Sequence, residues 1–211
     1  MSRSRTVLVL ALAVATAAGT PALATTKKLP APKPLVTTDP AGDANGINTE
    51  GGLVPVPSQS GQGQRSAADI LSVALGRLDD GKVVKGLTAT FTLSAAPDQG
   101  TIYRVQTSTP DCKIFWLSYN MPLGGPVSAN VTDDCDTAGT TVSTPVTATV
   151  KGTTITIAAP FASLNKKIKL GTTLSGMYGE TKGHVYTGVK NPTVPTIDET
   201  SVASATYKIG D

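Results

Sequence analysis

The chain has 211 residues, of which 39% are hydrophobic and 16% charged, and its formal net charge is +3 at pH 7. This length is enough for one domain of ordinary size with its own hydrophobic core. The nearly balanced charge argues against nucleic acid as a partner, because phosphate binding is driven by clustered Lys and Arg side chains.

The first 24 residues are typical of a secretory signal peptide. Arg3 and Arg5 precede an apolar run over residues 6–19, and Ala22-Leu23-Ala24 has the small-residue pattern of a cleavage site. The run is short for a membrane span, and no later window of similar length lacks polar residues. Removing Arg3 and Arg5 from the 18 basic residues leaves 16 against 15 acidic ones, a net charge of +1. We therefore expect a secreted, extracellular, monomeric protein without a membrane span in its mature chain.

Residues 25–38 follow as a Pro- and Lys-rich segment, in which Pro30, Pro32 and Pro34 restrict the backbone and remove hydrogen-bond donors. This composition predicts an extended spacer. The single domain is expected over residues 39–211. It begins with a Gly-, Pro- and Ser-rich stretch over residues 39–66 that has no sustained period and predicts a long loop.

Strand alternation dominates from Asp69 onward. Leu71, Val73 and Leu75 are predicted to share one buried face of the first long strand. The turn sequence Asp79-Asp80-Gly81 then leads to a second strand. That strand alternates apolar residues with Thr and Ser. Its expected buried residues are Leu87, Ala89, Phe91 and Leu93.

Similar alternation recurs to the end of the chain and includes a strand expected over residues 168–174. Helical periodicity is almost absent, apart from one short turn at residues 160–164. Many short strands separated by Gly and Pro predict an all-β fold, a two-sheet antiparallel jelly-roll-like β-sandwich. Cys112 and Cys135 are the only cysteines, and export would favour a disulfide between them.

The sequence DPAGDANG contains the sharpest local signal for chemistry. Asp39, Asp43 and Asn45 offer oxygen ligands of the kind that calcium prefers, and the intervening glycines allow the backbone to fold around an ion. The spacing is not that of an EF-hand loop. An Asx turn, in which the two Asp side chains accept hydrogen bonds from the backbone, would explain the same residues. Asp133, Asp134 and Asp136 could form a second cation site, although a solvated loop is the simpler interpretation.

The order of DPAGDANG, a Gly/Pro-rich loop, Ala68-Asp69-Ile70, the Asp79-Asp80-Gly81 turn and the closing segments IDET and ATYKIG resembles the carbohydrate-binding family 9-like or DOMON-like β-sandwiches of the glucodextranase type. The resemblance implies a calcium ion held by Asp39, Asp43 and Asp69, with Asn45 added on ligand chemistry. Asp198 could close the site from the other end of the chain.

The resemblance also implies a possible polysaccharide or cell-surface partner. Such modules stack a sugar ring on an exposed aromatic face. The chain has nine aromatic residues, including one Trp. Alternation over residues 113–121 places Trp116 opposite the more apolar face, so Trp116 is the candidate ligand-binding platform. Completion of the core, or packing near the Cys112 bridge, is the alternative for this side chain.

We expect a non-catalytic binding module, and two alternatives remain open. DOMON-like domains include haem binders, for which His184 with Met121 or Met177 would be the ligands. A small glycan-directed hydrolase would need a pair of carboxyl groups, with Glu50, Glu180 and Glu199 as the available glutamates. Carboxylates that converge only at the opening loop would favour the module.

Overall fold

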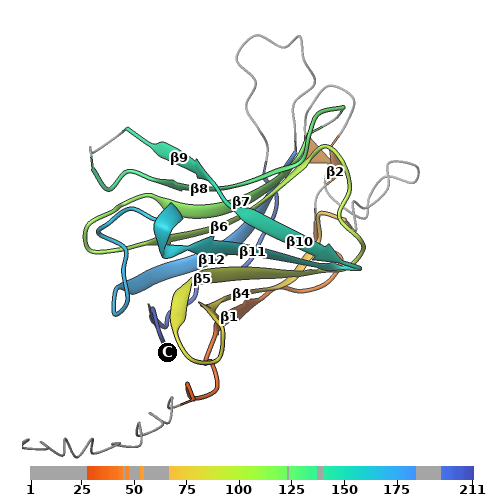
Figure 1. Ribbon diagram of the computed structural model, residues 1–211. Helices are drawn as coiled ribbons and strands as arrows, with labels where there is room; N and C mark the ends of the chain where they lie inside the picture. Colours follow the sequence, from red (N-terminus) through yellow and green to blue (C-terminus); the bar gives the residue numbers. More distant parts are fainter. Residues whose placement is uncertain are drawn as a thin grey trace, which may run out of the picture.

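A computed structural model describes residues 28–44, 46–47, 53–54, 67–122, 124–136, 140–183 and 196–211. Two antiparallel sheets lie face to face (Figure 1). The predicted all-β sandwich is therefore confirmed. The predicted signal peptide lies outside the described residues. Within them, no helix has the length and apolar character that crossing a bilayer requires.

The first sheet has five strands, and all its neighbours pair antiparallel. In spatial order they are β1 (Leu35–Thr38), β4 (Ile70–Asp79), β5 (Val84–Leu93), β11 (Thr154–Pro160) and β10 (Thr147–Lys151). The 3-10 turn η1 (Phe161–Ser163) follows β11, in the segment where a short helical turn was expected.

The second sheet has seven strands. Its main path is β13 (Thr196–Glu199), β12 (Thr173–Gly183), β6 (Thr101–Ser108), β7 (Phe115–Met121), β8 (Ser128–Asp133) and β9 (Val142–Pro145), and β14 (Tyr207–Lys208) pairs with β12. A separate two-stranded ribbon joins β2 (Gly46–Ile47) to β3 (Leu53–Val54).

The core lies between the two sheets and follows the alternation of the sequence. The β5 residues Leu87, Ala89, Phe91 and Leu93 are all buried, as predicted. Phe91 meets Tyr103 of β6 edge to face, with their ring centroids 6.1 Å apart. Gly179 of β12 permits close approach of the sheets, because a Cβ atom there would lie 2.3 Å from a methyl carbon of Val73. Local period-two patterning thus produces one continuous apolar interior.

Two expectations about strands are wrong. A β-bulge between Ile70 and Ser72 turns Ile70 inward, so Leu71 is only half-buried instead of sharing the face of Val73. The strand expected over residues 168–174 is a run of turns, and β12 begins only at Thr173. The Thr172 N–H donates to the Lys169 carbonyl inside this run, and the Gly171 N–H donates to the Ile209 carbonyl, so turns and one contact with the end of the chain satisfy these groups.

The described start of the chain lies against the domain. The Leu29 N–H donates to the Gly81 carbonyl at 3.0 Å, and the buried Arg77 guanidinium donates to the Pro30 carbonyl. The same guanidinium donates to the Gly210 carbonyl at 3.4 Å. Residues 35–38 of the expected spacer form β1 and belong to the five-stranded sheet. Arg77 ties the segment before β1 and the last residues of the chain to that sheet.

Candidate functional site

The loop that leaves β1 carries the first two acidic residues of the candidate site. Asp39 continues the pairing of β1 with β4, because its N–H donates to the Leu71 carbonyl at 3.1 Å. A turn follows, in which Gly42 has a φ of 87°, a conformation that glycine adopts without strain. This turn reverses the chain, so that Asp43 returns toward Asp39.

Asp69, immediately before β4, holds that turn in place. Its carboxylate is buried and accepts the Gly42 N–H at 3.0 and 3.1 Å. The Ser94 hydroxyl donates to the same carboxylate, and the Ser94 N–H donates to the Asp69 carbonyl at 3.0 Å. Asp69 therefore joins the turn of the opening loop to the end of β5.

Asp198 reaches the same place from β13 in the other sheet. Its side chain is 7% exposed, and one carboxylate oxygen accepts the Ile70 N–H at 2.6 Å. A small second core of Ala44, Ala68 and Ile197 lies beside it, with all three side chains fully buried. The edges of both sheets and the opening loop thus meet at Asp198.

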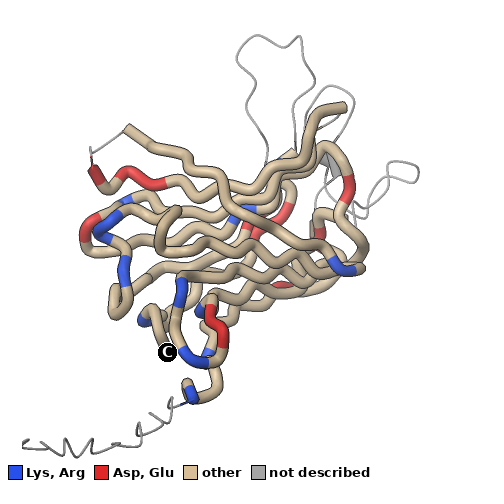
Figure 2. The backbone as a smooth tube through the Cα atoms, in the orientation of Figure 1, with Lys and Arg blue, Asp and Glu red and all other residues tan. Residues whose placement is uncertain are grey.

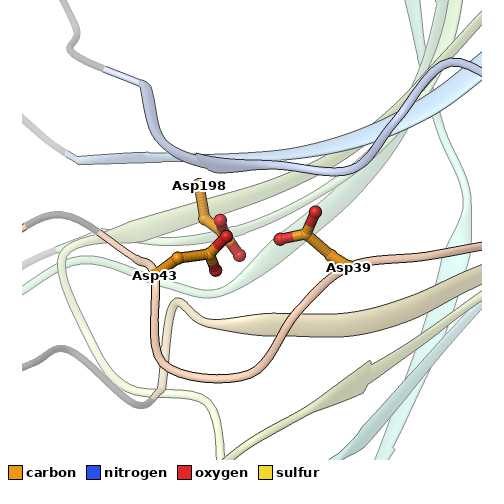
Figure 3. A group of neighbouring side chains, drawn as sticks. All are labelled: Asp39, Asp43 and Asp198. Carbon is orange, nitrogen blue, oxygen red and sulfur yellow. The ribbon is translucent and has the colours of Figure 1, made fainter.

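Asp39, Asp43 and Asp198 form one acidic group. One carboxylate oxygen from each lies within 4.8 Å of the others, and the three side chains point toward one another (Figure 3). Asp43 is exposed, Asp39 half-buried and Asp198 buried, so the group opens to solvent on one side. The Oδ2 atom of Asp39 is itself buried and has no hydrogen-bond partner in the described part of the chain. Three hard oxygen donors and an unsatisfied buried acceptor suit a hard cation.

The electrostatics of the group oppose full ionisation. Burial, together with the charges of Asp198 and Asp43, raises the pKa of Asp39 to about 7. The pKa of Asp198 is raised to about 6, with burial as the largest cause. The Ile70 N–H lowers that pKa, whereas the charges of Asp43 and Asp69 raise it. A cation between the carboxylates would remove this repulsion.

The structure places the four residues predicted to bind the metal in different positions. Asp39 and Asp43 do lie together, and Asp198, the residue suggested to close the site, completes the group. Asp69 lies outside the group of three and supports the loop. Asn45 lies outside the described residues. The contribution of Asp198 depends on strand pairing across the whole domain, for which the local sequence carries only a weak signal.

The predicted Cys112–Cys135 disulfide is present and joins the segment before β7 to the segment after β8. The solvated-loop interpretation is wrong for two of its acidic neighbours, because Asp133 and Asp134 are buried, whereas Asp136 is exposed. Asp133 accepts the Cys135 N–H at 3.1 Å, and Asp134 accepts the Ile114 N–H at 2.9 Å. These carboxylates serve as backbone caps.

Trp116 lies on the outer face of β7, opposite the buried Phe115 and Leu117, so the predicted side of the strand is confirmed. The Arg104 guanidinium lies 4.5 Å from the centroid of its ring. Arg104 also pairs with Glu180, one of the glutamates considered for hydrolysis.

Of the other glutamates and the haem candidates, some lie in strands or in the core and others lie outside the described residues. Glu199 is the strand partner of Glu180, whereas Glu50 lies outside the described residues. His184 also lies outside them, and Met177 is fully buried in the core.

Comparison of the chain with protein-family models, curated proteins and solved structures finds no match. The class of the protein therefore rests on what the fold and the acidic group themselves define: a disulfide-bonded β-sandwich with a cluster of carboxylates at the entry of its first loop.

Proposed function

We propose that this chain is an exported, non-catalytic binding module whose opening loop is held in place by a calcium ion at Asp39, Asp43 and Asp198. One observation carries the proposal: the buried Oδ2 atom of Asp39 lacks a hydrogen-bond partner in the described residues and faces two further carboxylates. A buried acceptor of this kind costs free energy unless something compensates it.

The chemistry of the ligands favours calcium among the common metals. Every donor in the acidic group is a carboxylate oxygen, which suits a hard cation and not zinc or copper. Calcium accepts six to eight oxygen ligands in flexible geometry. Three carboxylates can supply up to six of them, and water or backbone carbonyls could supply the others. Magnesium demands stricter octahedral geometry and usually keeps several waters.

Two features support export. The signal peptide predicted over residues 1–24 would direct the chain out of the cytosol. The Cys112–Cys135 disulfide is typical of proteins that fold in an oxidising compartment. The proposed partner, a polysaccharide or another surface polymer, follows from the outward-facing Trp116 and from the resemblance described above.

Calcium should raise the thermal midpoint of the mature protein above its value in chelator, because a ligand that binds only the folded state stabilises it. At a free concentration of 100 times Kd, the gain in unfolding free energy would be about 2.7 kcal/mol. Differential scanning calorimetry with calcium, with magnesium and with chelator measures it.

Asp43→Asn should abolish most of the shift, since it removes an exposed ligand with little effect on packing. Asp111→Asn is the matched control, because Asp111 is an exposed carboxylate outside the acidic group, and this variant should keep the full shift. Equal melting curves of the unmodified protein in calcium and in chelator would refute the proposal.

A further inference from the structure

A continuous row of side chains crosses the outer face of the seven-stranded sheet. Strand register places Tyr178 opposite Gln106, Gln106 opposite Trp116, and Trp116 opposite Thr132. Ser143 continues the row on β9. We call these five residues the aromatic row. Their neighbours along the strands, such as Val105, Leu117 and Val131, are buried, so alternation directs the aromatic row to the outer face of the sheet. On that face Tyr178, Gln106 and Trp116 are half-buried, whereas Thr132 is covered and its hydroxyl donates to Ser143.

The two aromatic side chains of this row are two strands apart. Strands in a sheet lie about 4.8 Å from each other, so Tyr178 and Trp116 are separated by roughly 10 Å. This is the two-residue repeat of an extended β-linked chain, the distance from one pyranose ring to the next but one. Gln106, on the strand between them, offers an amide where the intervening hydroxyl groups would lie.

A second row, adjacent to the first, carries its own charge balance. It runs through Glu180, Arg104, Ser118 and Asn130. Arg104 pairs with Glu180, and Lys182 lies 3.3 Å from the other oxygen of the same carboxylate. Glu199, the strand partner of Glu180 on β13, supplies a second carboxylate, so two negative charges balance the two cations. This balance favours an uncharged ligand over a polyanion.

Arg104 also positions the proposed stacking platform. Its guanidinium lies against one face of the Trp116 indole, 4.5 Å from the centroid, while the ion pair with Glu180 holds the guanidinium. A sugar ring would stack on the opposite face of the indole. The ring orientation is thus set before a ligand arrives, which lowers the entropic cost of binding.

The outer face of the other sheet lacks these features. Its central positions are Ala74, Thr90, Thr156 and Thr149, which lie opposite one another on four strands. No aromatic residue occupies this face within the described strands. Figure 2 shows that charged residues lie mainly at strand ends and in connecting segments. The aromatic row is therefore specific to one side of the sandwich.

We infer that a neutral, extended β-linked polysaccharide lies across the strands of the seven-stranded sheet, with two of its rings stacked on Tyr178 and Trp116. This inference rests on the proposed function, since it assigns the ligand class and the binding face of that module. Gln106 and Asn130 donate and accept hydrogen bonds at the ring hydroxyls. The chain runs along the aromatic row, perpendicular to the strands.

Isothermal titration of the calcium-loaded mature protein with cellohexaose, β-1,4-mannohexaose and xylohexaose tests the ligand class. At least one hexasaccharide should bind, with a Kd at least tenfold below that of its disaccharide, because only the longer chain reaches both aromatic side chains. Trp116→Ala and Tyr178→Ala should each weaken binding at least tenfold. Thr90→Ala, on the opposite face, should leave the Kd unchanged.

Several results would overturn the inference. They are no binding of any of the three hexasaccharides, unchanged affinity in either aromatic variant, equal affinity for disaccharide and hexasaccharide, or binding of polygalacturonate alone. The calcium-induced rise in thermal midpoint, measured on the same samples, reports on the proposed metal site separately. A retained rise without saccharide binding refutes only the inference about the ligand, whereas a missing rise refutes the metal site.

Discussion

The two ends of the sandwich use acidic residues in opposite ways. At the disulfide end, the buried carboxylates of Asp133 and Asp134 accept hydrogen bonds from the Cys135 and Ile114 N–H groups. At the end where the opening loop meets both sheets, Asp39, Asp43 and Asp198 point toward one another, and the Asp39 Oδ2 atom has no partner in the described residues.

This difference shows that aspartate can either accept backbone hydrogen bonds that stabilise the fold or provide ligands for a cation. A buried carboxylate whose oxygens meet N–H donors is already compensated, so an added cation gains little there. Carboxylates that meet one another are compensated only by protons or by a cation. The stability of the first end should therefore depend on redox state, and that of the second on pH and calcium.

Loss of the disulfide should have the largest effect on stability. The bridge closes a loop across a sequence separation of 23 residues, and its removal in a Cys112→Ala/Cys135→Ala variant should lower the unfolding free energy by about 3 kcal/mol. The large apolar core should still keep the domain folded at room temperature. Urea denaturation followed by circular dichroism measures both. A variant that is unfolded without urea, or as stable as the parent, would contradict the prediction.

The pH dependence should be next in size and confined to the acidic group. The folded pKa values of Asp39 and Asp198 are raised to about 7 and about 6 from the ordinary value of 3.8. Their protonated forms are therefore favoured by folding, and the associated stability is fully present below about pH 4 and lost as the pH rises through 6 to 7.

In chelator, the contribution of these two groups should make the protein less stable at pH 8 than at pH 5. Saturating calcium should reverse most of this loss. Asp39→Asn should make the thermal midpoint depend less on pH, because it removes the carboxyl group whose pKa is raised more. Thermal midpoints across this range, with Asp136→Asn at the other end as control, provide the measurement. A midpoint in chelator that rises steadily from pH 5 to 8 would count against the acidic group as described.

The smallest effect should come from the residue that supports the loop. Asp69→Asn keeps one acceptor for the Gly42 N–H but weakens charge-assisted hydrogen bonds, so the unfolding free energy should fall by about 1 kcal/mol. Calcium affinity should fall several-fold, because the turn that returns Asp43 toward Asp39 is held less firmly. Calorimetric titration with calcium checks this. An unchanged affinity would show that Asp69 has no role in ordering the loop.

The sequence by itself determined the features that depend on local pattern. The alternation of Leu87, Ala89 and Phe91 with threonines predicts a half-buried strand, because successive side chains point to opposite faces. The same rule places Trp116 outward. The carboxylate side chains of Asp39 and Asp43 and the glycines between and after them made these two residues candidate ligands, because such groups suit a hard cation.

Only the tertiary structure decided which distant residues meet. Asp198 joins Asp39 and Asp43 because β13 lies at the edge of its sheet beside the start of β4, and Tyr178 aligns with Trp116 through the register of β12, β6 and β7. The bulge that turns Ile70 inward and Leu71 outward likewise arises from pairing between β4 and β5. Alternation assigns a side chain to a face of its own strand, whereas strand order and register are set by the packing of the whole domain.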